Sequence, residues 1–417
     1  MTGLGRDLDD YSSVGDALTS VLGGLRVGRK VETVRTSESY GRAPARGLTS
    51  PGDVPAFATS HMDGFAVISD DLVGASVSSP VRLKVKGSGK LGGVFTPPIE
   101  HGEAVRVATG GRLPRKADAV LPIEDAEERD GILLVDSASK RGDHVYPAGG
   151  DIAAGETILS AGQPIRAQDI GLLLSLGYTT VRVWRRPTVS IIATGSELTD
   201  SAKPSGGKVR NSHAPILLRL CEAQGCRALE HGVVPDDERE VRSAIRGALT
   251  KSDFVITLGG TSIGRHDVVG EALNSLRPLV MAHGLKMDRG RVTGVAVVRG
   301  KPVLMAPGPI QGAVNAFILL GIPIIRNLAG TKQREVLLRC TMGKDWTARK
   351  RFADFQKVLY VKLVPGEEAI AEPLLGETES MKVLTQADGY VWVREGVNQI
   401  AKGTKVTVRL IPGFSFP

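Results

Sequence analysis

The chain has 417 residues, of which 41% are hydrophobic, 24% charged and 4% aromatic, and its formal net charge is +8. This length suits two to four domains, and the composition is that of a globular protein rather than a fibrous or disordered chain. Because the 53 basic residues are scattered and aromatic residues are few, we expect no nucleic-acid partner; the charge favours solubility and attraction for small anions.

The first thirty residues contain four aspartates, which is not typical of a signal peptide, and no apolar stretch reaches the length of a membrane span. We therefore expect a cytoplasmic protein with no membrane partner. The three cysteines, Cys221, Cys226 and Cys340, match no zinc pattern and are too few for a disulfide framework.

Residues 1–27 are predicted to contain a helix, because Val14, Leu18, Val21, Leu22 and Leu25 lie near helical spacing, and residues 30–50 are predicted to be extended and irregular. Asp63-Gly64 is a turn signal that leads into a short strand. Residues 80–145 alternate short apolar runs with Gly and Pro, which indicates a small β-barrel or β-rich module. Inside it, Thr109-Gly110-Gly111 is either an anion-binding loop or the end of a hairpin.

From residue 188 the pattern changes to alternating strands and helices. Four of the apolar runs are followed by loops that carry glycine, proline or acidic residues, and these loops begin at Thr194, Pro235, Gly259 and Pro307. We expect an open, mostly parallel, doubly wound sheet, in which these loops share the carboxyl edge where ligands bind. After residue 331, alternation predicts a separate C-terminal β domain.

The most informative of these loops follows the apolar run 254–258. Paired glycines, Gly259-Gly260, let the backbone turn sharply and approach a ligand. Bare amides with the hydroxyls of Thr261 and Ser262 would make an anion site, and Asp267, three residues past Gly264, could hold a metal ion against that anion. The alternative is a tight strand-to-helix turn with a helix cap.

With its motifs taken in order, the chain resembles the molybdopterin molybdenumtransferase family, the MoeA-like proteins of molybdenum cofactor assembly. The motifs that carry the resemblance span nearly the whole chain: Ser60 with Asp63-Gly64-Phe65-Ala66, Thr109-Gly110 with Leu113-Pro114, Gly150-Asp151-Ile152, Thr194-Gly195 with Glu197-Leu198, Asn211, Asp236, and Gly259-Gly260 with Ser262, Gly264 and Asp267.

The resemblance implies a multidomain α/β fold. An elongated N-terminal domain would comprise residues 1–48 and 146–182, with a β-rich domain, 49–145, inserted in it. A βαβ molybdopterin-binding domain, 183–330, and a C-terminal β domain, 331–417, would follow. The resemblance also implies a homodimer, with each site between the βαβ domain of one subunit and the inserted domain of the other.

The implied reaction inserts molybdate or tungstate into adenylylated molybdopterin and releases AMP, with a molybdopterin adenylyltransferase as the upstream partner. The catalytic residues implied are Asp63, Thr109, Glu197, Asp236 and Asp267. Of these, Glu197, Asp236 and Asp267 would hold a divalent cation, Mg²⁺. The implied binding residues for the pterin substrate and the oxyanion are Ser60, Gly110, Thr194, Gly195, Gly259, Gly260, Ser262, Gly264, Arg289, Arg291 and Pro307.

Two segments depart from the family pattern. The usual Pro-Gly-Lys/Arg-Pro segment appears as Asp288-Arg289-Gly290-Arg291-Val292, and the usual Pro-Gly-Asn-Pro loop as Pro307-Gly308-Pro309-Ile310. Arg289 and Arg291 could compensate, because guanidinium groups suit tetrahedral oxyanions. The alternative is a diverged paralogue that binds molybdopterin or acts as a scaffold with weak or no transferase activity. A single-domain adenylyltransferase is disfavoured by the three extra domains.

Overall fold

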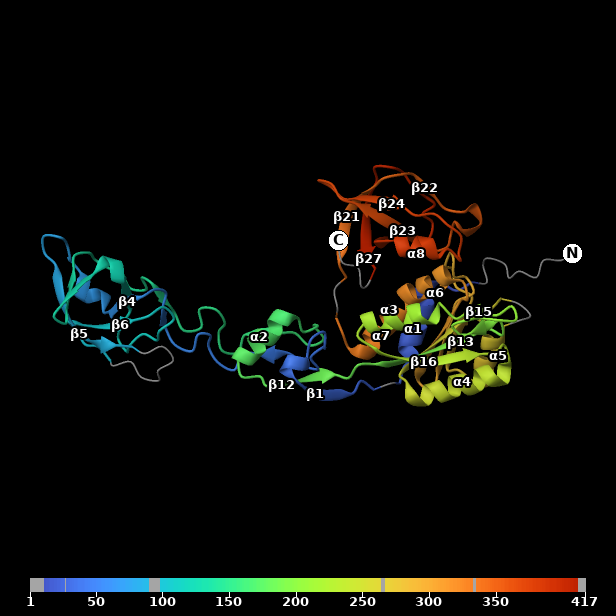
Figure 1. Cartoon of the computed structure of the whole chain (residues 1–417), viewed down its shortest axis with the longest axis horizontal. Coiled ribbons are helices and arrows are strands. Elements are labelled where there is room, and N and C mark those ends of the chain that lie inside the picture. The colour runs from blue at the N-terminus through green and yellow to red at the C-terminus, as the bar shows by residue number, and fades with distance from the viewer. Residues whose placement is uncertain (1–10, 27, 90–97, 264–266, 333–334, 412–417) are drawn as a thin grey trace. The chain divides into compact units, whose positions relative to one another are not determined.

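The computed structural model describes residues 11–26, 28–89, 98–263, 267–332 and 335–411. Within them the chain forms two compact units (Figure 1). Unit 1 comprises Met1–Arg46, Gly162–Ile170 and Thr180–Pro417, and unit 2 comprises Gly47–Ala161 and Gly171–Thr179. The boundaries of the four domains expected from the sequence stay a prediction.

A six-stranded sheet lies at the centre of unit 1, in the order β16-β13-β17-β20-β19-β18. Four strands are parallel: β16 (Arg227–Val234), β13 (Thr188–Thr194), β17 (Phe254–Leu258) and β20 (Lys301–Ala306). Antiparallel pairing adds β19 (Gly294–Val298) and β18 (Val280–His283). Every residue of β13 and β17 is buried, as expected for apolar strands that are covered on both faces.

Helices cover both faces of this sheet. One face packs against α1 (Val14–Gly24), α3 (Ala214–Ala223) and the continuous helix formed by α6 (Ile310–Ala316), η5 (Phe317–Gly321) and α7 (Ile322–Ala329). The other face packs against α4 (Glu238–Lys251) and α5 (Val268–Ser275). Alternate residues of each strand enter the two cores, so the doubly wound architecture predicted from the sequence is confirmed.

The continuous helix Ile310–Ala329 corrects one expectation. It has 20 residues and a mean hydropathy of 1.5, so by length and composition it could cross a membrane. However, 78% of its apolar window is buried inside unit 1, where it forms part of the core beneath the sheet. It ends at Gly330, whose φ of 61° is the left-handed conformation that commonly terminates helices.

A closed five-stranded barrel ends the chain, in the order β21-β24-β23-β25-β27. Its strands are β21 (Leu337–Met342), β24 (Ile370–Pro373), β23 (Lys357–Val364), β25 (Gly389–Val393) and β27 (Lys405–Leu410). Inward side chains fill the barrel, while Tyr360 and Tyr390 face the core of the central sheet domain. The predicted C-terminal β domain is therefore confirmed.

Unit 1 also contains a separate two-stranded sheet. Strand β1 (Val31–Arg35) pairs antiparallel with β12 (Thr180–Trp184), which brings together segments far apart in the sequence. The guanidinium of Arg42 donates to Glu32 and to the carbonyl of Trp184, so it links both strands.

Unit 2 contains an open six-stranded sheet in the order β7-β4-β6-β5-β9-β8, so the predicted β-rich module is a sheet rather than a closed barrel. Its strands are β4 (Gly64–Val67), β5 (Val81–Ser88), β6 (Glu103–Val107), β7 (Ala119–Pro122), β8 (Glu127–Arg129) and β9 (Ile132–Val135). Separate hydrophobic clusters cover its two faces.

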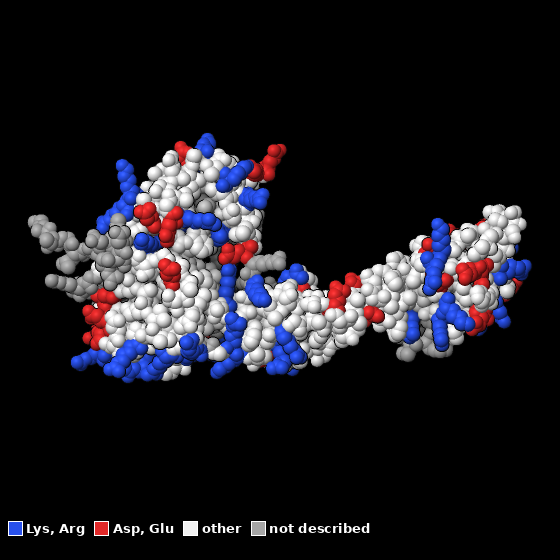
Figure 2. Space-filling model, turned by 180° about the vertical axis from the view of Figure 1, so that it is seen from behind, with Lys and Arg blue, Asp and Glu red and all other residues white. Residues whose placement is uncertain are grey.

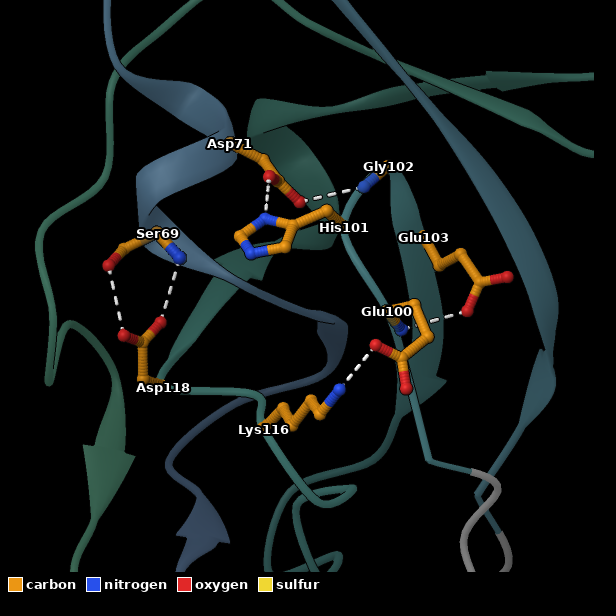
Figure 3. Close-up of polar contacts among 8 residues, drawn as sticks. All are labelled: Ser69, Asp71, Glu100, His101, Gly102, Glu103, Lys116 and Asp118. Carbon is orange, nitrogen blue, oxygen red and sulfur yellow. Dashed lines mark hydrogen bonds and ion pairs between the residues drawn. The ribbon is translucent and has the colours of Figure 1, made fainter.

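Hydrogen bonds to the carboxylates of Asp71 and Asp118 connect the short helix η3 (Ser69–Leu72) to neighbouring segments of unit 2 (Figure 3). Asp71 accepts hydrogen bonds from the backbone of Gly102 at 2.9 Å and lies 2.6 Å from Nδ1 of His101. Asp118 accepts from both the backbone and the hydroxyl of Ser69. The hydrogen bond and charge of Asp71 raise the pKa of His101, so the pair attracts most strongly when the imidazole is protonated.

Folding gathers some of the basic residues that are scattered in the sequence. Figure 2 shows Lys and Arg side chains in a row along the lower edge of unit 1, where Figure 1 places α4. The exposed residues of that helix include Arg239, Arg246 and Lys251. No aromatic residue belongs to α4, so this helix supplies none of the stacking groups that nucleic-acid binding uses.

Candidate functional site

A cavity of about 740 Å³ opens at the carboxyl edge of the central sheet. Its walls come from the loops that follow β13, β16, β17 and β20, which are the four loops that the sequence places together at this edge. The lining residues are Thr194, Gly195, Glu197, Leu198, Val209, Arg210, Asn211, Ser212, His213, Asp236, Leu258, Gly259, Gly260, Thr261, Val268, Gly308 and Pro309.

The paired glycines after β17 are required by the geometry of this edge. Gly259 and Gly260 have φ values of 85° and 64°, which disfavour residues with a side chain. A Cβ on Gly259 would lie 2.4 Å from the carbonyl oxygen of Thr194, and one on Gly260 would lie 2.7 Å from the Thr194 side chain. Both glycines therefore let the ends of β13 and β17 approach each other under the cavity.

Only part of the predicted anion loop is available to a ligand. The Gly259 amide donates to the carbonyl of Ala306, and the Ser262 amide lies 3.3 Å from the Asp267 carboxylate. Within the described part of the chain, the amides of Gly260 and Thr261 have no protein acceptor. The structure therefore narrows the candidate amide donors in this loop to these two. Gly264 lies outside the described residues.

Asp267 caps helix α5. The loop therefore matches the alternative interpretation of this stretch, a strand-to-helix turn with a helix cap. The Asp267 carboxylate accepts from the Gly270 amide at 3.1 Å and lies 3.1 Å from Nδ1 of His283. The other nitrogen of that imidazole lies 3.0 Å from the hydroxyl of Thr261, which lines the cavity. Asp267 does not line the cavity, so its connection to the site runs through His283 and Thr261.

The other two predicted metal ligands lie in the cavity wall. Asp236 accepts from the Ser196 amide at 2.8 Å, and its own amide donates to the Ser196 hydroxyl at 3.0 Å. Glu197 lies over Gly195, where an added Cβ would be 2.7 Å from a carboxylate oxygen. Among the described residues, no three His, Cys, Asp or Glu side chains form a group that could hold a metal ion.

The cavity also contains residues that the sequence did not single out as site residues. Arg210 and Ser212 border it on either side of Asn211, whose amide donates to Asp200 at 3.0 Å. Nδ1 of His213 lies 3.1 Å from the carbonyl of Gly308 and so supports the loop after β20. These residues belong to the segment between β15 (Val209–Arg210) and α3, which carries no strand-and-glycine pattern.

The two predicted oxyanion-binding arginines border a neighbouring cavity of about 280 Å³, together with Pro307. Pro309 belongs to the walls of both cavities. The Arg289 guanidinium donates to the side chain of Gln311, and burial lowers its pKa. Arg291 is exposed, and its guanidinium lies 6.0 Å from the ring centroid of Phe352.

The remaining predicted site residues lie together in unit 2. Asp63 accepts from the amide of Thr109 at 2.7 Å and from its hydroxyl at 2.9 Å. These bonds lower the pKa of Asp63, so its carboxylate stays ionised at lower pH than a free aspartate. The amide of Gly110 donates to the carbonyl of Ser60 at 2.8 Å, which fixes the two loops side by side.

Comparisons with known proteins agree with this arrangement. Residues 12–177 match the family described as "MoeA N-terminal region (domain I and II)", residues 190–327 the "Probable molybdopterin binding domain", and residues 339–411 the "MoeA C-terminal region (domain IV)". A protein of Staphylococcus aureus (strain MRSA252), named molybdopterin molybdenumtransferase, is 31% identical over 328 residues, which are 78% of each chain. The chain belongs to the MoeA family.

Other MoeA relatives cover more of the chain. A molybdopterin molybdenumtransferase of Staphylococcus epidermidis (strain RP62A) is 29% identical over 387 residues, which are 92% of each protein. The crystal structure of a molybdopterin biosynthesis MoeA protein from Pyrococcus horikoshii, 29% identical, covers 97% of this chain and all of that one, with a TM-score of 0.85. The predicted family and multidomain fold class are therefore confirmed.

Proposed function

We propose that this MoeA-family chain is a molybdopterin molybdenumtransferase, which inserts molybdate or tungstate into adenylylated molybdopterin and releases AMP. The observation that carries the proposal is the cavity at the carboxyl edge of the sheet, because it combines glycine backbone, two amides without an acceptor among the described residues, and two carboxylates. The names of the relatives that align over most of the chain support the same reaction.

The cavity suits a substrate of this size and charge. Its volume of about 740 Å³ lies within the range of small-molecule sites, roughly 300–1,000 Å³. The Thr261 hydroxyl donates to the carbonyl of Val292 and lies 3.0 Å from Nε2 of His283, which leaves the amides of Gly260 and Thr261 as the candidate donors to a phosphate. These groups would hold the pterin phosphate while the phosphoanhydride to AMP is cleaved.

Glu197 and Asp236 fit a magnesium ion better than Asp267 does. Mg²⁺ is usually held by one or two carboxylates together with substrate phosphates, and Glu197 and Asp236 share the cavity wall. Asp267 accepts hydrogen bonds at the start of α5 and pairs with His283, so its role as a metal ligand stays a prediction. When bound, the ion would neutralise charge that develops on the phosphoanhydride.

We further propose a cytoplasmic homodimer in which Asp63 and Thr109 of one copy complete the site of the other. The support is chemical: hydrogen bonds from Thr109 favour the ionised form of Asp63, and both residues belong to unit 2, whereas Glu197 and Asp236 belong to unit 1. A molybdopterin adenylyltransferase would supply the substrate.

The direct test is reconstitution with purified protein, adenylylated molybdopterin, Mg²⁺ and either oxyanion. Wild type should release AMP and form the metal-bound cofactor. Glu197→Gln should lower AMP release about 100-fold, because one charge that faces the phosphates is lost.

Asp267→Asn separates the two proposed roles of Asp267, metal ligand and helix cap, since asparagine also caps helices. Normal Mg²⁺ dependence in Asp267→Asn would assign Asp267 to the cap alone, and no AMP release by wild type would reject the transferase.

The altered 288–292 segment yields a separate prediction. Arg291→Ala should weaken molybdate and tungstate binding by about 1.5–3 kcal/mol, because a charge-assisted hydrogen bond is removed. This loss of affinity should become smaller as the salt concentration is raised, because salt screens the charge of Arg291. Arg246→Ala, which removes an exposed arginine of α4, serves as the control and should leave the affinity unchanged. Calorimetry at two salt concentrations measures both effects. An Arg291 variant with unaltered affinity and salt dependence would favour the diverged paralogue.

A further inference from the structure

His283, which the sequence did not single out, ends strand β18 beside the loop that follows β17. Its side chain is 13% exposed. In the antiparallel pairing of β18 with β19 it lies opposite Gly294, where an added Cβ would be 3.0 Å from Cδ2 of the imidazole. The ring therefore occupies space that a larger residue at position 294 would fill.

The imidazole contacts a polar side chain through each of its two nitrogens. Nδ1 lies 3.1 Å from Oδ2 of Asp267, and Nε2 lies 3.0 Å from Oγ1 of Thr261. The other oxygen of the same carboxylate, Oδ1, accepts from the Gly270 amide, which fixes Asp267 at the start of α5. Asp267, His283 and Thr261 thus form a continuous polar chain from the cap of α5 to the wall of the sheet-edge cavity.

This chain joins the two ends of one loop. Thr261 lies near the start of the segment between β17 and α5, and Asp267 lies at its end. The base of the loop is closed by the Val269 amide, which donates to the carbonyl of Gly260 at 3.1 Å. His283 adds a bridge across the loop from a different strand of the sheet.

Thr261 is the end of the bridge that lines the cavity. Its hydroxyl donates to the carbonyl of Val292 at 3.2 Å, so its oxygen is held between this carbonyl and the His283 ring. The backbone amides of Gly260 and Thr261 are the candidate donors to a phosphate. A side chain that two partners hold restricts the backbone that carries it, so His283 helps to fix the direction of these amides.

A buried histidine between two polar groups can also serve stability alone. Here the same ring contacts Asp267, which does not line the cavity, and Thr261, which does. Loss of the contact with Thr261 would release the loop at the cavity wall, whereas loss of the contact with Asp267 would affect the cap of α5. The two contacts therefore lead to different expectations for ligand binding.

We propose that His283 is a positioning residue of the transferase: by contacting Thr261 and Asp267 at once, it holds the loop so that the amides of Gly260 and Thr261 can donate to the substrate phosphate. The inference rests on the proposed function, because the phosphate is that of its substrate. It also gives Asp267 a role in the site that requires no contact with the ligand.

Substitutions of His283 can separate its two contacts. Glutamine places its amide near the position of Nε2 and asparagine near that of Nδ1, and a side-chain amide can donate or accept hydrogen bonds. His283→Gln should keep the contact with Thr261, and His283→Asn only the contact with Asp267. Calorimetry without Mg²⁺ measures the Kd of adenylylated molybdopterin in the absence of turnover. We expect this Kd to rise about tenfold in His283→Asn and to stay within about threefold of wild type in His283→Gln.

A double-mutant cycle tests whether His283 acts through Thr261. Thr261→Val removes the hydroxyl and should raise the Kd about as much as His283→Asn does, roughly tenfold. The variant with both substitutions should bind no more weakly than Thr261→Val alone, because the contact is already absent. His231→Ala removes an exposed histidine of β16, in the same sheet, and should bind as wild type does.

Equal losses of affinity in His283→Gln and His283→Asn would overturn the inference, and so would additive losses in the double variant. If His283→Asn does not fold, Thr261→Val still decides, since wild-type affinity in that variant would exclude a role of the contact. Failure of the proposed function gives a different result, in which wild type binds the substrate and releases no AMP when Mg²⁺ is added. The comparison of Kd values would then still decide the role of His283.

Discussion

The Gly259→Ala variant is expected to be less stable than wild type and to release AMP much more slowly. The new Cβ would lie 2.4 Å from the Thr194 carbonyl oxygen, and the φ of 85° is itself strained for alanine. We expect the free energy of unfolding to fall by about 3 kcal/mol. AMP release should fall about 100-fold or more, since small displacements of reacting groups have effects of that size.

Gly308→Ala is the matched control for stability. Gly308 borders the same cavity, but a Cβ there would meet only the Gly259 Cα at 3.8 Å, which is ordinary contact. Urea unfolding should therefore distinguish the two variants clearly. Equal stability of Gly259→Ala and Gly308→Ala would mean that the turn after β17 adapts to a side chain, and that the glycine pair is not required by the fold.

Mixing two inactive variants is expected to restore activity if the proposed dimer shares its sites. Asp63→Ala lacks the acid of unit 2, and Glu197→Gln lacks the acid of the sheet-edge cavity. In a mixed dimer, one site would combine Glu197 from the first chain with Asp63 from the second. Random reassociation should yield about a quarter of wild-type AMP release, because half the dimers are mixed and half their sites are intact.

Two different affinity tags, one on each variant, allow the mixed dimers to be isolated. The measured activity then does not depend on how completely the chains reassociate. Each variant mixed with itself provides the baseline. A chain that carries both substitutions should give no recovery when mixed with either single variant. Mixed dimers without activity above the baseline would show that Asp63 and Glu197 act in the same chain or in different steps.

The central sheet could be predicted because the apolar runs in the sequence coincide with the buried strands of the structure. The apolar runs that became β13 and β17 are buried at every position, and the loops that end them carry the glycines and acids of the cavity. Parallel strands bring such loops to one edge, so Glu197, Asp236 and Gly259 could be placed together without coordinates. The alternation in the segments that form β25 and β27 likewise predicted the C-terminal β domain, although not that it closes into a barrel.

What the sequence could not supply depends on partners far along the chain. The expectation that Arg289 binds an oxyanion rested on the resemblance to a family segment and stays a prediction. The contact of its guanidinium with Gln311, and its place at a cavity completed by the barrel, could not be derived from the sequence. His283 belongs to a strand that was not predicted, and its contact with Asp267 spans 16 residues. Neither contact is reflected in the hydrophobic periodicity or the composition of the sequence.

The helix Ile310–Ala329 depends on the C-terminal part of the chain for some of its hydrogen bonds. Gln311 and Asn315 are fully buried in it. Some of their partners precede them, since Arg289 donates to Gln311 and the Asn315 amide donates to the carbonyl of Arg289 at 3.2 Å. Their other partners come later in the chain: the carbonyls of Glu377 and Ser380, and the hydroxyl of Tyr360. Until those residues emerge, the nascent central sheet has a core helix with polar side chains that lack these partners. The C-terminal part of the chain therefore completes the hydrogen bonding of two buried side chains of the central domain, and we expect the packing around them to be completed only after residue 380 has been translated.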